Sequence, residues 1–224
     1  MTKVYPNAGA GIGSALTAGS EPERQQLVKS EPVVLTVWKK SLLFNCDGFT
    51  VFDAKGNLVF RVDNYAAGSK GEISLMDASG TSLLTIRRKR MTLGDNWLVF
   101  EGEKTVNPRF SARKQVNLLN TRSLAQVSSG GSASAGSSSP TGPSPRTKNV
   151  MYEIEGSYAQ RCCAVYDDKR RRVAEIKQKE AVRGVAFGAD VFRLVVQPEV
   201  DSAVAMALVI LLDQMYGSSR RFST

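Results

Sequence analysis

The chain of 224 residues contains no histidine. Histidine is the usual general base near neutral pH, the usual partner of a serine or cysteine nucleophile, and the commonest metal ligand. Its absence argues against a hydrolase built on a Ser–His or Cys–His pair and against a histidine metal site. The sequence therefore predicts a protein that is not an enzyme and that carries no cofactor or metal.

Cysteine is scarce, and the three that occur are Cys46 and the adjacent pair Cys162–Cys163. An odd count without a CxxC spacing indicates neither a disulfide framework nor a zinc site. The adjacent pair lies in an expected strand, where successive side chains point to opposite faces, so the two thiols cannot hold one metal together and one of them should be in the core. A reducing setting, cytosolic or nuclear, is predicted.

Long apolar runs are also lacking, and the most apolar segment is only Ala203 to Leu212, in which no residue is polar. A bilayer core takes about 20 apolar residues, so a run of this length is typical of a helix buried in a protein core. Asp201 is the expected N-cap, and Gly217 is expected to end the helix in a left-handed turn. Insertion of residues 203–216 in a membrane is the alternative. No secretory signal is expected, and Thr2 in place of glycine excludes N-myristoylation.

What the chain has is positive charge, 30 Lys and Arg against 21 Asp and Glu, for a net charge of +9. Nucleic acid, anionic lipid and acidic proteins are all compatible partners, as is a protein whose surface is merely basic.

A short motif repeats three times: an apolar pair, an aspartate, a polar turn and an apolar strand. The aspartate can accept hydrogen bonds from backbone N–H groups of the turn, and glycine supplies positive φ where it is present. The third copy has Arg170 in the glycine position, so its turn is predicted to differ in type. The copies are Val51–Val62, Leu75–Ile86 and Val165–Ile176.

Other segments alternate apolar and polar residues, as strands with one buried face do. Asp47–Gly48, between two apolar runs, predicts a tight hairpin. The expected strands outside the repeats are 33–38, 42–46, 49–52, 96–101, 110–114, 151–156, 159–165 and 191–196.

Three segments have compositions that cannot offset the entropy of ordering. Residues 1–31 are expected to form a flexible arm, a Ser/Gly/Pro insertion at about 128–148 a disordered loop, and residues 218–224 a flexible tail. Because the repeat occurs on both sides of the insertion, residues 32–217 are predicted to form a single domain.

Many antiparallel strands and one wholly apolar helix favour a closed barrel, which has no exposed edge and can be filled by a central helix. The alanines of the helix would let strands approach closely.

The chain also resembles the plant LURP-one-related proteins of the Tubby C-terminal-like superfamily, to which the phospholipid scramblases are related. The resemblance spans roughly Glu31 to Tyr216 and implies a mainly β fold, a twelve-stranded antiparallel β-barrel around the C-terminal helix. The segments that carry it are Val37–Leu42, Phe49–Gly56, Phe60–Tyr65, Leu75–Gly80, Leu84–Lys89 and Asp201–Ala203.

The candidate binding residues are basic clusters, since Arg and Lys gathered on one rim could hold an inositol phosphate. Superfamily relatives bind phosphoinositides through basic residues of the barrel surface, so the resemblance implies a non-catalytic module in plant defence signalling, intracellular and peripheral at the plasma membrane. Solvated strand ends, nuclear import, a membrane-tethered transcription regulator that binds DNA, and a scramblase-like anchored protein stay open as alternatives. Protein partners are not indicated. The candidates are Lys39, Lys40, Arg87, Arg88, Lys89, Arg90, Lys169, Arg170, Arg171 and Arg172.

Overall fold

The computed structural model describes residues 31–40, 42, 47–64, 71–89, 95–104, 106–115, 122–130, 150–181 and 187–217. The predicted N-terminal arm up to residue 30, residues 43–46 of the predicted strand 42–46, residues 131–148 of the predicted insertion and the tail 218–224 lie outside these ranges, as does Arg90.

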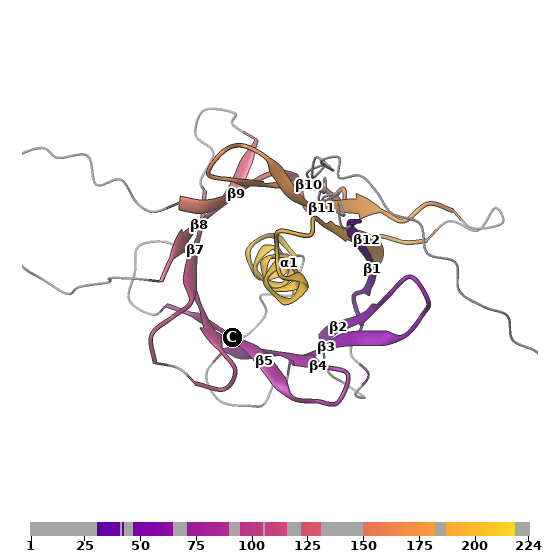
Figure 1. The fold of residues 1–224 in the computed structure, drawn as a ribbon, viewed down its shortest axis with the longest axis horizontal. Coiled ribbons are helices and arrows are strands. Elements are labelled where there is room, and N and C mark those ends of the chain that lie inside the picture. Colours follow the sequence, from indigo (N-terminus) through magenta and orange to yellow (C-terminus); the bar gives the residue numbers. More distant parts are fainter. Residues whose placement is uncertain are drawn as a thin grey trace, which may run out of the picture. The chain divides into compact units, whose positions relative to one another are not determined.

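Twelve antiparallel strands close into one barrel around a single helix, α1 (Figure 1), which confirms the predicted fold class. Each strand pairs with the next along the chain, and β1 pairs with β12 to close the circle. The strands are β1 Val33–Trp38, β2 Asp47–Phe52, β3 Leu58–Asn64, β4 Glu72–Asp77, β5 Ser82–Arg88, β6 Asn96–Glu101, β7 Phe110–Lys114, β8 Ser123–Ser129, β9 Val150–Ser157, β10 Cys162–Asp167, β11 Arg172–Gln178 and β12 Val191–Val196.

The apolar residues that alternate with polar ones along each strand form the inner face of the barrel. Leu35 and Val37 on β1 are buried and stand opposite Leu194 and Phe192 on β12. Trp38, one residue on, points outward and is exposed. The Cys162–Cys163 pair follows the same rule, because Cys162 is exposed and Cys163 is buried.

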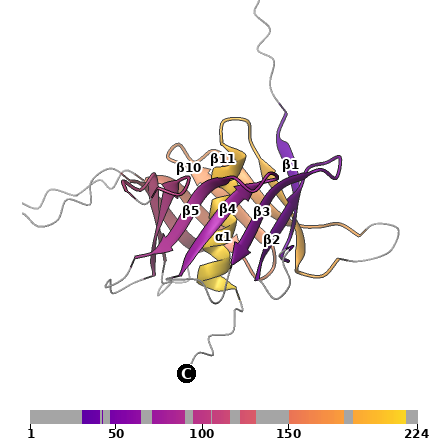
Figure 2. The same ribbon diagram turned by 90° about the horizontal axis from the view of Figure 1, so that it is seen from below.

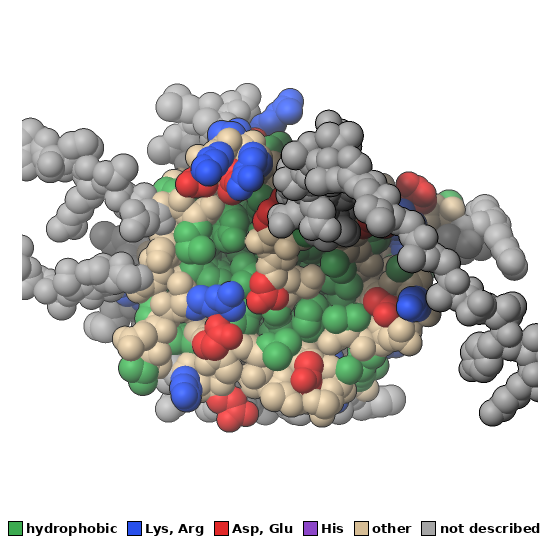
Figure 3. All heavy atoms as spheres, viewed as in Figure 1, with side chains coloured by type: hydrophobic (Ala, Val, Ile, Leu, Met, Phe, Trp, Pro, Cys, Tyr) green, Lys and Arg blue, Asp and Glu red, His purple; other side chains and the backbone are tan. Residues whose placement is uncertain are grey.

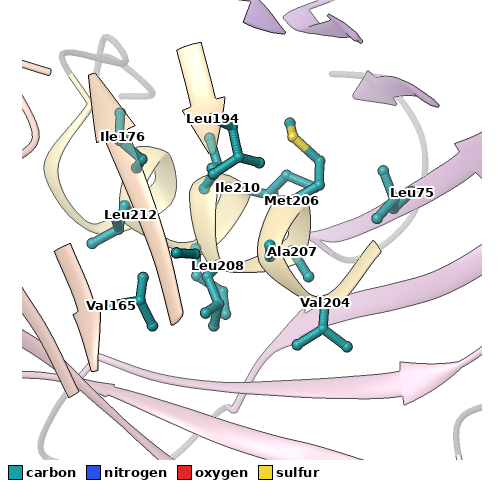
Figure 4. Close-up of a cluster of buried hydrophobic side chains, with 14 of the residues drawn as sticks. Leu75, Val165, Ile176, Leu194, Val204, Met206, Ala207, Leu208, Ile210 and Leu212 are labelled. Carbon is teal, nitrogen blue, oxygen red and sulfur yellow. The ribbon is translucent and has the colours of Figure 1, made fainter. Parts of the chain in front are cut away.

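Helix α1, Ser202–Tyr216, lies inside the barrel (Figures 1 and 2), and every residue from Ala203 to Leu212 is buried. Figure 4 shows its side chains in one cluster with Val165, Ile176 and Leu194 of the surrounding strands. A helix that is apolar on every side is stable only when it is covered on every side, and the barrel supplies that cover. No described helix has the length and apolarity to cross a membrane.

The N-terminal cap of α1 agrees with the sequence prediction, whereas its C-terminal end does not. Asp201 caps the helix as predicted, since its carboxylate accepts a hydrogen bond of 2.8 Å from the Ala203 N–H. The left-handed turn predicted at Gly217 is wrong, because Gly217 has φ −63° and ψ 146°. Its Cβ would lie 2.7 Å from Asp213 Oδ1 and closer still to the Asp213 carbonyl oxygen. The sequence has glycine at position 217 because the backbone there lies too close to Asp213 for a side chain, and not because it needs a positive φ.

The three repeats form matching hairpin turns, and the different turn type predicted for the third is wrong. Gly56, Gly80 and Arg170 all have positive φ, at 86°, 94° and 61°. In each turn the aspartate carbonyl accepts from this residue, and its carboxylate accepts from the following N–H at 2.8–2.9 Å. The aspartate bonds therefore impose the turn even on an arginine. The aspartates are Asp53, Asp77 and Asp167.

Two further sequence predictions are corrected at strand boundaries. Asp47 and Gly48 do not form a tight turn but begin β2, where they pair with Asn64 and Asp63. The predicted insertion began at residue 128, yet Ser128 and Ser129 belong to β8 and pair with Ser111 and Phe110. Strand β8 itself was not predicted. In both places neighbouring strands supply hydrogen bonds that local composition does not reveal.

The antiparallel order places successive turns at alternating ends of the barrel. We call the end near Asp201 the helix-start end and the end near Gly217 the helix-finish end (Figure 2). The three aspartate turns lie at the helix-start end. Strands β1 and β11 end, and strands β2 and β12 begin, at the helix-finish end.

Candidate functional site

Helix α1 occupies the barrel interior, so the described side chains that could meet a partner lie at the two ends and on the outer wall.

The Lys169–Arg172 cluster lies at the tip of the β10–β11 hairpin, at the helix-start end. Its arginines are already paired: Arg170 reaches Glu153 and Glu155 at 2.9 Å each, Arg171 reaches Asp167 at 2.7 Å, and Arg172 reaches Glu175 at 3.4 Å. The hydrogen bond to Glu155 raises the pKa of Arg170. Figure 3 shows Lys or Arg and Asp or Glu side chains intermingled over this hairpin.

The Arg87–Arg90 cluster lies at the opposite, helix-finish end, where β5 ends. Arg87 pairs with Glu72 at 2.8 Å and Arg88 pairs with Asp95. Lys89 is exposed and its backbone N–H bonds the Asn96 carbonyl at 2.8 Å. Two of the three described cations of this cluster therefore have carboxylate partners.

Lys39 and Lys40 follow β1, also at the helix-finish end, and have different partners. Lys39 Nζ lies 2.8 Å from Oδ1 of Asp213, a residue of α1 that is only 4% exposed. Lys40 Nζ lies 5.4 Å from the centroid of the exposed Trp38 ring. Lys39 therefore secures the helix inside the barrel, whereas Lys40 is on the outer surface.

Asp213 belongs to a buried polar group that holds the last turns of α1. The Tyr158 hydroxyl donates to Asp213 Oδ1 at 3.1 Å, and burial raises the pKa of Tyr158. Lys114 Nζ donates to the Met215 carbonyl at 2.6 Å. Arg161, itself buried, stacks on Tyr158 and donates to the Ala189 carbonyl at 2.7 Å. A buried carboxylate is tolerated only with such partners.

The structure does not bring the candidate clusters together on one rim. Residues 169–172 lie at the helix-start end, and residues 39–40 and 87–89 lie at the helix-finish end. The latter two groups are further separated around the wall by β2, β3 and β4. A single site formed by all of these residues is therefore not what the fold presents.

The structure adds a surface that the sequence clusters missed, on the outer face of β11, β12 and β1. Lys177 stands opposite Arg193, and Arg193 stands opposite Thr36. Lys179 Nζ lies 3.4 Å from Thr36 Oγ1 and 5.2 Å from the Phe187 ring centroid. The sequence does contain a sign of this surface: the polar positions that alternate with the buried ones, because residues two apart in a strand share a face. We call this surface the β1–β12 face; it comprises Thr36, Trp38, Lys40, Lys177, Lys179, Phe187, Val191 and Arg193 and, two residues after Lys40 in the β1–β2 connection, the exposed Leu42.

Comparison with known proteins places the fold in a family. A family model described as LURP-one-related matches residues 33–213. LURP-one-related 8 of Arabidopsis thaliana is 54% identical over 223 residues, covering 98% of this chain and 100% of the relative. LURP-one-related 17 of the same plant is 44% identical over 196 residues, covering 81% of this chain and 82% of the relative.

A solved structure agrees with this fold. The crystal structure of an Arabidopsis thaliana protein superimposes with a TM-score of 0.58 at 24% identity, covering 82% of this chain and 91% of that one. At this identity the likeness speaks for the fold alone. The family match over residues 33–213 and the 54% identity with LURP-one-related 8 show that the chain belongs to the LURP-one-related family.

Proposed function

We propose that the protein is a non-catalytic binding module that docks on the anionic headgroups of a phospholipid membrane through the β1–β12 face. One observation carries the proposal: Lys40 and Lys179 contact aromatic rings and a hydroxyl on the outer surface, and no carboxylate partner is seen for either among the described residues. Their ammonium groups can meet a phosphate without first losing an ion pair.

The other candidate clusters are less suited to bind a headgroup, because their arginines are already paired with carboxylates. A headgroup phosphate at Arg170, Arg171 or Arg172 would have to displace Glu153, Glu155, Asp167 or Glu175. Exchanging one carboxylate for one phosphate gains little at an exposed site. A lysine near an anionic bilayer contributes about 1 kcal/mol when it brings no such competitor.

The filled barrel supports docking through the outer surface and not through the helix. The helix residues that a membrane-inserted alternative would place in lipid, 203–216, are within the barrel and mostly buried. Binding through the outer surface leaves them in place. A role in plant defence signalling and a preference for phosphoinositides are parts of the proposal that rest on the family resemblance.

Vesicle co-sedimentation tests the proposal. The full chain is mixed with vesicles of phosphatidylcholine alone, with added phosphatidylserine, or with added phosphoinositide. We expect binding to the two anionic mixtures. Lys40→Glu/Lys179→Glu should weaken it by at least about 25-fold, which is roughly fivefold for each lysine removed.

The matched control reverses two exposed lysines at the helix-start end, Lys55→Glu/Lys104→Glu, with the same change in net charge. Only a general electrostatic loss is expected from this control, well below that of the Lys40/Lys179 variant. Equal losses in both variants, or no binding of the wild-type protein to either anionic mixture, would refute docking through the β1–β12 face.

A further inference from the structure

The β1–β12 face also carries large apolar side chains that point into solvent. Trp38 is 42% exposed and Leu42 is 55% exposed, and Phe187 is partly exposed on the β11–β12 connection. The described parts of that connection leave the barrel wall sideways in Figures 1 and 2. Since Trp97, the other tryptophan, is buried inside the barrel, the exposure of Trp38 is not a general feature of the aromatic residues.

We infer that the β1–β12 face is a membrane-insertion surface, in which Trp38 and Leu42 enter the headgroup and upper acyl layer of a phospholipid bilayer while Lys40 and Lys179 stay at the phosphates. The inference rests on the proposed function and adds its mode of contact, an apolar anchor beside the charges.

The lysine–aromatic geometry fits a bilayer interface. Lys40 Nζ is 5.4 Å from the Trp38 ring centroid and Lys179 Nζ is 5.2 Å from that of Phe187. Trp is enriched at the level of the headgroups, where an apolar ring and a polar N–H are both accommodated. Lys keeps its aliphatic stem along apolar surface while its charge remains in the polar layer. Each lysine–aromatic pair thus places an aromatic ring where the upper acyl chains lie and an ammonium group where the phosphates lie.

The surface is held in place before any lipid arrives. The Lys39 N–H donates to the Asp190 carbonyl at 2.7 Å, and the Thr50 hydroxyl donates to the Lys40 carbonyl at 2.7 Å. Trp38 pairs with Val191 on one side and Thr50 on the other. The backbone of Trp38, Lys39 and Lys40 is therefore ordered in the free protein, so its ordering does not oppose binding.

Nearby carboxylates limit the electrostatic share of binding. Glu175 pairs with Lys177 at 2.9 Å, Glu180 pairs with Arg193 at 3.8 Å, and Asp190 is exposed beside Lys39. Electrostatic attraction alone would therefore bind this face to a membrane only weakly. Apolar insertion supplies a part of the affinity that salt does not screen.

These features favour a bilayer over an acidic peptide as the partner. Burial of Trp38 and Leu42 gains free energy in proportion to the apolar area covered, and a fluid lipid layer adapts to side chains that project from a wall. An acidic peptide would contact the lysines and leave these apolar groups exposed.

Tryptophan fluorescence on vesicles is the direct test, because Trp97 supplies a buried and constant background. With phosphatidylcholine/phosphatidylserine vesicles we expect a blue shift of the emission, and quenching by lipids brominated near the top of the acyl chain. Trp38→Phe keeps an aromatic anchor, so it should abolish the shift and quenching while binding persists. Trp38→Ala/Leu42→Ala should weaken partitioning by about tenfold or more, and part of the wild-type binding should survive 0.5 M NaCl.

The matched control is Val106→Ala at the helix-start end. It trims the large apolar side chain that is most exposed among the described residues, at 76%, and should leave partitioning unchanged. Circular dichroism confirms that each variant is folded. Binding without blue shift or quenching, with Trp38→Ala/Leu42→Ala as tight as wild type, would overturn insertion and leave the proposed headgroup docking standing. Binding of an acidic peptide but of no vesicle would overturn both.

Discussion

Leu208 is the residue at which the buried-helix architecture can be tested most sharply. It lies at the middle of α1, is 2% exposed, and belongs to the cluster formed by the helix and the barrel wall (Figure 4). Leu208→Ala removes three carbon groups, worth about 0.8 kcal/mol each, or roughly 2.5 kcal/mol in transfer free energy. The cavity left in the rigid wall adds to this, so we expect a loss of about 3–5 kcal/mol in the free energy of unfolding.

Urea unfolding followed by the fluorescence of the buried Trp97 measures this loss. The slope of the unfolding free energy against urea should be unchanged, because the native fold is the same. Gln214→Ala, on the same helix but only partly buried, serves as the control and should change stability by less than about 0.5 kcal/mol.

A charge at the same position extends the test. Leu208→Asp should prevent the whole barrel from folding, because a carboxylate would be buried without a partner. A folded Leu208→Asp protein, or a loss below about 1 kcal/mol for Leu208→Ala, would refute a helix enclosed by the strands.

Four further predictions rest on local geometry and burial. Arg170→Gly should be about 1 kcal/mol more stable than Arg170→Ala in urea unfolding, since both lose the exposed ion pairs but only glycine adopts the φ of 61° without strain; equal stabilities would show that the turn is not strained. Gly217→Ala should lower the melting temperature, because the new Cβ meets Asp213, and a value unchanged from wild type would contradict this close approach. Burial raises the pKa of the Cys163 thiol to about 12, so the folded state keeps a proton that the unfolded chain releases above pH 9. Stability should therefore fall between pH 9 and about pH 12, by up to about 1.4 kcal/mol per pH unit from this group, and Cys163→Ala should reduce that slope. A thiol reagent at pH 8 should modify the exposed Cys162 and spare Cys163.

The site was harder to predict than the fold. Runs of Arg and Lys in the sequence drew attention to residues 87–90 and 169–172, yet their described arginines are paired with carboxylates from neighbouring strands. Lys177, Lys179 and Arg193 are dispersed in the sequence and meet only because β11, β12 and β1 are neighbours in the barrel. The sequence shows a run of like charges directly, but it does not show which carboxylates of other strands will pair with them.

Features that depend on neighbours in the chain were determined by the sequence itself. Helix α1 follows from a short apolar run with Asp201 as its cap, and each aspartate turn follows from hydrogen bonds spanning four residues. The inward positions of most strands follow from an alternation of period two.

Features that depend on distant partners were decided only by the tertiary structure. The polar strand β8 exists because β7 and β9 supply its hydrogen bonds, and Asp47–Gly48 is extended because β3 pairs with it. The exposure of Trp38 follows from its place on the outer wall beside β12. The physical reason is common to all three: each feature is fixed by atoms far away in sequence, whose proximity the closing of the barrel creates.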